Sequence, residues 1–397
     1  MRFVTWLRSL APRPASPRPR RARLSLEPLE ERAVPSAGHD VLYVGDQGNS
    51  NADTNTVKEF DAATGAPLGT LVAPNAAGLH GPRGMVFRNP GQLLVVNQNQ
   101  SPPSGIPGEI LRYNGRAGDP LGALVPRDDP HAPDVPRGMV LRDNVLYVGN
   151  LADAVSPQGA VTIPGEVDRY DANSGKFLGK LVPANFPGPF EPRGVVFGPD
   201  GGLYVSSFDA AHPAAGYVVR FDPARGASQI IAANNGDGID QPGELKDLHR
   251  PEGLTFGPDG KLYVTSFRAD ANDFDRILVL DPTTGAEVKS IALDAVGQPR
   301  AFAEAILFGP GGRLFAPITS TGAVRSYDVS DENFGSFVNF ESPGTLGFPW
   351  YLTFGQTDPA TLAYGTPDDL SPELVNALLS LKKGHDLSGV GDPALTP

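Results

Sequence analysis

The sequence predicts an all-β fold, a six-bladed β-propeller of four-stranded blades, and two observations lead to this prediction. One phrase recurs along the chain, with copies at Pro82–Val96, Pro136–Val148, Pro192–Val205, Pro251–Val264, Ala303–Ala316 and, in part, Pro349–Phe354. The copies start 46 to 59 residues apart, and short apolar runs separated by turn residues fill the intervals. A repeated unit of this kind is typical of a propeller rather than of one compact sheet.

The third copy shows how one unit builds a blade. The apolar run Gly194–Phe197 ends in a Gly-Pro-Asp-Gly sequence that favours a tight turn, and Leu203–Phe208 follows it. Tyr217–Asp222 and Ser228–Ala232 continue the unit with β-branched and aromatic residues. We therefore expect four antiparallel strands, called a, b, c and d in chain order. The other units repeat the third strand, at Glu109–Asn114, Glu166–Asp171, Arg276–Asp281 and Ala323–Asp328.

The two ends of the repeat array complete one further blade. Leu42–Gln47, Val57–Asp61 and Leu68–Val72 supply strands b, c and d without a strand a, and Trp350–Phe354 offers the missing strand. Such closure removes the free edges that an open sheet would expose. Ala360–Tyr364 is left over, either as a further strand of the closing blade or as the start of a seventh.

The repeats divide the chain into three parts. Residues 37–365 form the propeller, residues 1–36 a disordered targeting segment, and residues 366–397 a C-terminal helix and tail. In the expected helix Ser371 is the N-cap, Pro372 lies in the first turn and Gly384 ends the helix.

Charge and composition exclude several classes of partner. Residues 1–36 hold eight Arg and three Glu, which leaves 25 of the 33 basic and 42 of the 45 acidic residues for the rest of the chain. An acidic body disfavours nucleic acid and anionic membrane surfaces. The chain has no Cys, and no apolar run is long enough for a transmembrane helix. We expect a monomer.

The N-terminal part carries a second recognisable sequence, RLSLEPLEERAVPS at Arg23–Ser36. It resembles the LEPLEER–PS export segment of planctomycete surface proteins. The resemblance implies that the protein is exported, to the cell surface or the extracellular space. The alternative is a disordered basic tail.

The repeated phrase also resembles a known family. Its P-x-G start, GPDG turn and LYV strand, followed by an RFDP-like strand end, are similar to NHL repeats and to the six-bladed propellers of the gluconolactonase, or senescence-marker-protein, superfamily. The resemblance covers about Val41–Phe354 and concerns the fold, which carries unrelated functions.

Loop lengths favour one face of the propeller as the functional face. The a–b and c–d turns are short, whereas the b–c and d–a connections are long and irregular, and in a meander these two sets emerge on the same side. Two rings of residues are expected at the central axis on that face. The first follows the opening Pro of strand a and comprises Arg83, Arg137, Arg193, Glu252, Glu304 and Trp350. The second ends strand b and comprises Asp46, Asn97, Asn150, Ser207, Ser266 and Ile318.

The first ring has two interpretations. Three converging guanidinium groups need counter-charges, and pairing of Arg193 with Glu252 and of Arg83 with Asp46 would simply plug the channel. Alternatively the arginines form an anion site, since Arg binds carboxylate and phosphate groups through two hydrogen bonds at once.

A more specific form of the functional interpretation adds a divalent metal ion opposite the arginines. The gluconolactonase resemblance implies one divalent ion on the axis, and Asp46, Asn97, Asn150, Glu252 and Glu304 carry oxygens that suit Ca²⁺ or Mg²⁺. The family's opening Glu-Gly-Pro-x-Trp sequence is not present here, so the catalytic residues remain unknown. Two weaker candidates lie elsewhere. One is a loop with Asn235, Asp237 and Glu244, which partly matches a calcium-binding loop; the alternative is a turn with solvent-exposed acids. The other is the pair His80 and His249, which lie just before two of the strands a.

The sequence thus predicts an exported, non-catalytic binding or surface-scaffold module. Its ligand, expected near Arg83, Arg137, Arg193 and Trp350, is a protein, a glycan or a small anion. The alternative is a divalent-metal-dependent hydrolase or lactonase. The enzyme needs the two glutamates to converge on one ion with Asp46 and an Asn, whereas pairing of those oxygens with the arginines favours the binding module.

Overall fold

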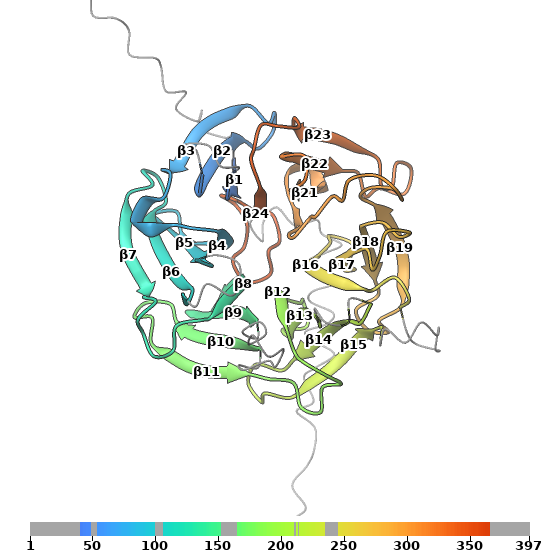
Figure 1. Ribbon diagram of the computed structural model, residues 1–397, viewed down its shortest axis with the longest axis horizontal. Coiled ribbons are helices and arrows are strands. Elements are labelled where there is room, and N and C mark those ends of the chain that lie inside the picture. The colour runs from blue at the N-terminus through green and yellow to red at the C-terminus, as the bar shows by residue number, and fades with distance from the viewer. Residues whose placement is uncertain are drawn as a thin grey trace, which may run out of the picture.

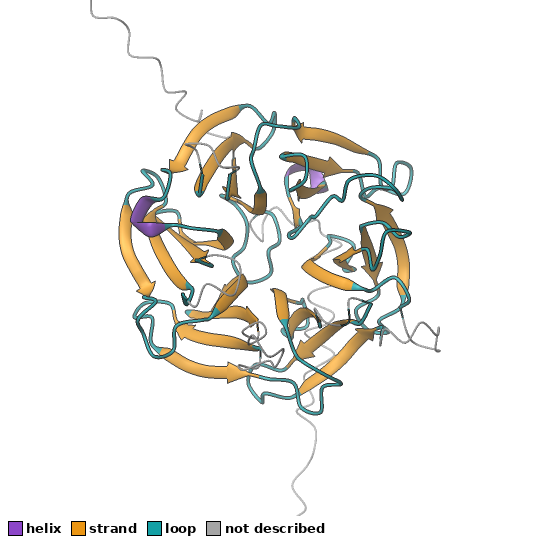
Figure 2. Ribbon diagram, viewed as in Figure 1, coloured by secondary structure: helices purple, strands orange, loops and turns teal. Residues whose placement is uncertain are grey.

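The computed structural model describes residues 40–48, 54–99, 106–151, 165–209, 212, 214–234 and 245–365. Their strands form six four-stranded antiparallel sheets, which surround a central axis as the blades of a propeller (Figure 1). Strands dominate the molecule, and two 3-10 helices, η1 (Ala76–Gly78) and η2 (Pro310–Gly312), lie in its connections (Figure 2). The predicted fold class and blade number are confirmed. The export segment 1–36, the helix expected in 366–397, and the loop residues Asn235, Asp237 and Glu244 lie outside the described residues.

Each blade runs from an inner strand a to an outer strand d. Blades 1 to 3 are formed by β24 (Pro349–Phe354), β1 (Val41–Asp46), β2 (Thr56–Asp61) and β3 (Pro67–Val72); by β4 (Pro82–Asn89), β5 (Gln92–Asn97), β6 (Glu109–Asn114) and β7 (Pro120–Val125); and by β8 (Val135–Arg142), β9 (Val145–Leu151), β10 (Glu166–Asp171) and β11 (Phe177–Leu181). Blades 4 to 6 are formed by β12 (Pro192–Phe197), β13 (Leu203–Phe208), β14 (Gly216–Phe221) and β15 (Ser228–Ala233); by β16 (Arg250–Phe256), β17 (Leu262–Phe267), β18 (Arg276–Leu280) and β19 (Glu287–Ala292); and by β20 (Leu307–Phe308), β21 (Leu314–Ile318), β22 (Ala323–Tyr327) and β23 (Phe337–Glu341).

Blade 1 closes the ring as the sequence predicts. Its inner strand β24 comes from the C-terminal end of the array and pairs antiparallel with β1, from Leu42 opposite Phe354 to Asp46 opposite Pro349 (Figure 1). None of the described residues forms a helix long and apolar enough to cross a membrane.

The P-x-G start of the phrase has a structural cause. Pro82 pairs with Asn97 and the next pair is Met85 with Val95, so strand a carries one extra residue, a β-bulge that changes where the following side chain points. The glycine is required because inner strands of neighbouring blades touch at the axis. A Cβ on Gly84 would lie 2.6 Å from the backbone nitrogen of Met139 in blade 3.

The aromatic residues of the phrase join each blade to the next. Tyr147 of β9 packs edge-on against Phe197 of β12, with ring centroids 5.0 Å apart, and equivalent pairs recur around the propeller. The equivalents are Tyr43 with Phe87, Tyr204 with Phe256, Tyr263 with Phe308 and Phe315 with Phe354. The recurring LYV and phenylalanine positions are thus the inter-blade core.

The segment after β24 is neither a further strand nor the start of a seventh blade. Asp358 begins a tight turn in which its Oδ1 accepts hydrogen bonds from the N–H and hydroxyl of Thr361. The turn lies across the short-loop end of the channel, where Leu141 N donates to Pro359 O at 2.7 Å and Phe197 N to Ala360 O at 3.1 Å. Leu362 then lines the channel floor.

Candidate functional site

The first predicted ring comes together at the long-loop end of the channel. Five of its six residues follow a proline at the start of an inner strand, where a β-bulge directs the side chain to the axis: Arg83, Arg137, Arg193, Glu252 and Trp350. The sixth, Glu304, follows Ala303 and precedes β20. Arg83, Arg193, Glu252 and Glu304 are buried, and Arg137 is partly exposed. Charged groups held so far from water require partners.

Glu304 is the centre of the arginine arc. Its Oε2 accepts from Arg83 Nη1 at 2.5 Å and from Arg137 Nη1 at 3.2 Å. Arg83 also donates through Nε to Gln98, and its guanidinium lies 3.6 Å from the ring centroid of Trp350. The predicted pairing of Arg83 with Asp46 is therefore wrong, because Glu304 takes that place.

Arg193 has two carboxylate partners. Glu252 lies 3.5 Å from it, as the sequence predicts, and Glu191 lies 3.0 Å from it. Sequence reasoning missed Glu191 because it precedes the opening proline and so falls outside both rings. With Glu191 included, three glutamates balance the three arginines of the ring.

Burial and ion pairing set the charge states of the ring. Burial lowers the pKa of Arg83 to about 10, against the effect of Glu304. Burial also acts to lower the pKa of Arg137, but Glu304 and Glu252 outweigh it and raise that pKa. The pKa of Glu304 is raised by burial, although Arg83 and Arg137 act to lower it. Arg137 is thus the most firmly charged arginine of the three.

Several polar atoms at this mouth remain without a partner among the described residues. They are Arg137 Nε, Arg193 Nε, Glu252 Oε2, Gln98 Nε2, Trp350 Nε1 and the hydroxyl of Tyr351, all buried. Tyr351 occupies the position where four copies of the phrase have glycine, and its side chain lines the channel. Burial raises the pKa of Tyr351, and Glu252 and Glu304 raise it further. Because buried polar groups are normally hydrogen-bonded, we expect groups other than the described residues to complete these hydrogen bonds.

The second predicted ring does not line the axis. Each of its polar residues instead accepts a backbone N–H from the loop that enters its own blade, because strand a starts beside the end of strand b. Asp46 accepts from Phe348 at 2.8 Å, Asn97 from His80 at 2.7 Å and Asn150 from Val135 at 2.9 Å. Ser207 and Ser266 accept from Glu191 and His249, both at 3.0 Å. In blade 6 Ile318 cannot do this, and the hydroxyl of Thr319 contacts Phe302 O and Pro349 O instead.

The oxygens that an axial divalent ion would need are bound to different partners in different blades. Glu304 and Glu252 face arginines, whereas Asp46, Asn97 and Asn150 hold loops in three separate blades. Within the described ranges, no group of three or more His, Asp or Glu side chains is placed to hold a metal ion. The donor set expected from the sequence therefore does not fit one ion in this arrangement.

Below the ring the channel is narrow and closed. Gly84, Gly138, Gly194 and Gly253 bring the inner strands close together, and Leu362 lies at the opposite end. The remaining cavity measures about 40 Å³, which is space for a water molecule or two. Within the described part of the chain, the turn Asp358–Leu362 covers the end of the channel opposite the ring.

Comparison with known proteins bears on the fold. No family model matches this chain, and no curated protein is similar to it in sequence. Among solved structures it is similar to a candidate 6-phosphogluconolactonase from Bacteroides fragilis, with a TM-score of 0.50 and 13% identity over 81% of this chain and 99% of that one. A candidate 6-phosphogluconolactonase from Bacteroides uniformis gives 0.50 and 13% over 80% and 99%. A protein of unknown function from Bacteroides caccae gives 0.50 and 14% over 80% and 98%.

The likeness shows the fold. At these identities it says nothing about which reaction, if any, the chain performs.

Proposed function

We propose that this protein is a non-catalytic binding or surface-scaffold module whose ligand occupies the long-loop mouth of the central channel. The observation that carries the proposal is the set of buried, unpartnered atoms on Arg137, Glu252 and Tyr351 beside an otherwise paired ring. A buried polar group without a hydrogen bond costs about 1 to 3 kcal/mol. A ligand that supplies both donors and acceptors recovers that free energy.

The charge balance favours a hydroxyl-rich ligand. Three glutamates already neutralise the three arginines, so a small anion gains less from the arc than the sequence alone indicates. Hydroxyl groups can accept from Arg137 Nε and donate to Glu252 Oε2. Phe348, two residues before Trp350 in the chain, is 41% accessible and adds an exposed apolar side chain. A glycan, or a partner protein that presents similar groups, meets these requirements.

The setting of the module is proposed from the sequence. We place it outside the cell, at the surface or released, because Arg23–Ser36 resembles an export segment. The acidic propeller disfavours nucleic acid as a partner, and we expect the protein to act as a monomer.

A divalent-metal-dependent hydrolase or lactonase is the second candidate, and the resemblance of the repeated phrase to the gluconolactonase superfamily favours it. The ion pairs weigh against it. An ion on the axis would have to draw Glu304 away from Arg83 and Arg137, and breaking a buried ion pair costs about 3 to 5 kcal/mol. We therefore prefer the binding module.

A glycan array probed with the labelled protein tests the proposal. Two variants are used: Tyr351→Phe removes only the unpartnered hydroxyl, and Arg137→Gln removes the unpartnered Nε together with the ion pair to Glu304. Their controls are Arg116→Gln, at an exposed c–d turn, and Tyr147→Phe, in the inter-blade core. Binding that both site variants weaken and both controls retain supports the proposal. Binding that the site variants retain places the ligand elsewhere, and an array without any bound glycan contradicts a glycan as the ligand class.

A further inference from the structure

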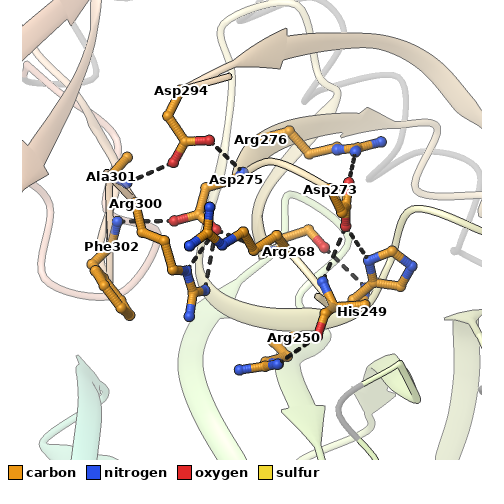
Figure 3. Close-up of polar contacts among 12 residues, drawn as sticks. His249, Arg250, Arg268, Asp273, Asp275, Arg276, Asp294, Arg300, Ala301 and Phe302 are labelled. Atoms are coloured by element: carbon orange, nitrogen blue, oxygen red, sulfur yellow. Dashed lines mark hydrogen bonds and ion pairs between the residues drawn. The ribbon is translucent and has the colours of Figure 1, made fainter. Parts of the chain in front are cut away.

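A second group of arginines lies on the long-loop face of blade 5. Arg250 begins β16, Arg268 follows β17, and Arg300 lies in the connection to blade 6. Figure 3 shows them around Asp275, a residue with no exposed surface. The group adjoins the channel mouth, since Arg250 stands two residues before Glu252 on β16.

The buried carboxylate of Asp275 is fully engaged. Its Oδ1 accepts from Arg300, at 3.1 Å from Nη2 and 3.3 Å from Nε, and from the backbone N–H of Arg268 at 2.8 Å. Its Oδ2 accepts from the N–H of Phe302 at 3.0 Å. Asp275 therefore neutralises Arg300 and holds two loops.

The other carboxylates drawn in Figure 3 are engaged as well. Asp294 accepts the N–H of Asp275 at 3.0 Å and of Ala301 at 2.7 Å. Asp273 pairs with Arg276 and with His249 Nδ1, which lies 2.9 Å away. Arg276 also pairs with Asp247 at 2.5 Å. Arg276 and His249 thus have their own carboxylate partners, which are separate from the carboxylate that binds Arg300.

Arg250 and Arg268 are left without a carboxylate partner in the described part of the chain. Arg250 donates to the carbonyl of Ala269 at 2.8 Å and Arg268 to that of Gln298 at 3.3 Å. The Nε of Arg250 is buried and has no acceptor among the described residues. Burial, and then the charges of Arg300 and Arg268, lower the pKa of Arg250. Like charges placed together need a counter-ion.

We propose that Arg250 and Arg268, held beside Arg300, bind a sulfate or phosphate group carried by a larger ligand. Neither Arg250 nor Arg268 has a carboxylate within ion-pair distance among the described residues, and the forked guanidinium group suits two hydrogen bonds to a tetrahedral anion. Loss of one charge-assisted pair of hydrogen bonds is expected to weaken binding about tenfold or more. The proposal does not depend on what binds at the ring of Arg83, Arg137, Arg193, Glu191, Glu252 and Glu304.

Calorimetric titration of sodium sulfate, sodium phosphate and sodium acetate at constant ionic strength tests this site. We expect saturable binding of sulfate or phosphate, in preference to acetate, and at least a tenfold loss of affinity in Arg250→Gln and in Arg268→Gln. The control Arg116→Gln makes the same charge change at an exposed turn and should bind as the wild type does. Tighter binding of sulfate than of phosphate indicates a sulfated ligand, and the reverse order indicates a phosphorylated one.

Two results would overturn the proposal. One is the lack of saturable binding of either tetrahedral anion to the wild type. The other is an unchanged affinity in Arg268→Gln. That variant keeps the experiment decisive if Arg250→Gln fails to fold, because Arg268 lies on a loop and its guanidinium group has a single carbonyl partner. Thermal unfolding followed by circular dichroism confirms that each variant used is folded.

Discussion

Arg83 and Glu304 are 221 residues apart in the chain, yet their side chains form a buried ion pair 2.5 Å long. Arg83 belongs to blade 2 and Glu304 to blade 6, so the pair reaches across the start of blade 1, the blade that both ends of the array close. The same carboxylate also binds Arg137 of blade 3. The ring at the channel mouth therefore links three blades and supports the closure as well as lining the candidate site.

Loss of this carboxylate should destabilise the whole propeller. Glu304→Gln leaves the buried Arg83 and the partly exposed Arg137 without their shared counter-charge, which costs about 3 to 5 kcal/mol. Equilibrium unfolding in urea measures the change in free energy. The control Glu287→Gln removes an exposed carboxylate from the outer strand β19 and should change little. Equal stabilities of the two variants would show that the ion pair is not a structural link.

A buried carboxyl in blade 3 should make stability depend on pH. Burial, and then the charge of Glu166, raise the pKa of Asp168 from 3.8 to about 8. Between these values the folded state holds a proton that the unfolded state has released, so the free energy of unfolding falls as pH rises through this range. Asp168→Asn should remove this part of the pH dependence and be the more stable protein above about pH 8.

Urea unfolding at about pH 5 and about pH 9 checks this prediction. The wild type should lose stability between the two conditions by more than Asp168→Asn does. A loss of the same size in both proteins would mean that Asp168 titrates with an ordinary pKa.

The turn that covers the channel floor contains a strained residue. Asp358–Leu362 has the hydrogen bonds of the c–d turn Asp171–Gly175, with Leu362 N donating to Asp358 O at 2.9 Å. In the c–d turn the last residue is Gly175 at φ 74°, whereas here it is Leu362 at φ 56°. A leucine in the left-handed region costs about 1 to 2 kcal/mol. We infer that its side chain is retained because it packs into the floor between blades.

The strain predicts an unusual order of stability. Leu362→Ala loses the packing and keeps the strain, whereas Leu362→Gly loses the packing and relieves the strain. Glycine should therefore be the less harmful substitution by about 1 kcal/mol. Thermal unfolding of the two variants measures the difference, and a more stable alanine variant would contradict the assigned backbone strain.

The close approach of the inner strands is testable at one glycine. A Cβ on Gly138 would lie 2.8 Å from the carbonyl oxygen of Arg193 in blade 4, so Gly138→Ala should cost about 1 to 3 kcal/mol. At Gly45 the nearest atom would be 3.3 Å away, and Gly45→Ala serves as the milder control. Urea unfolding compares the two. A smaller loss at Gly138 than at Gly45 would mean that the inner strands can move apart.

The sequence predicts the architecture well because the causes of that architecture are local and repeated. The Pro-x-Gly bulge recurs in four units and the Gly-Pro-Asp-Gly turn in two, and short apolar strands recur in the same order in all six units. That order decides which loops share a face. The residues of the first ring can be predicted for the same reason, because Arg83 and Glu304 occupy equivalent positions in two copies of the phrase.

Pairing within the ring depends on geometry that no local pattern contains. Arg83 meets Glu304 across the closing blade, and Glu191 enters from a connection of irregular length. The residues at the ends of strands b were placed at the axis because they lie next to strand a. They face the incoming loop instead, since its backbone N–H groups need acceptors there. Likewise, Arg250 comes from the start of β16, and Arg268 and Arg300 come from two separate connections, so only the folded chain brings them together.

The glutamates at the mouth pair with the arginines, and we propose that this leaves the site to a non-metal ligand. Calorimetric titration of Ca²⁺ and Mg²⁺ into the chelator-treated full chain tests this pairing, with Glu252→Gln measured in parallel. We predict no saturable binding of either ion that depends on Glu252. Tight binding of one ion, lost in Glu252→Gln, would contradict the account and favour a metal-dependent hydrolase.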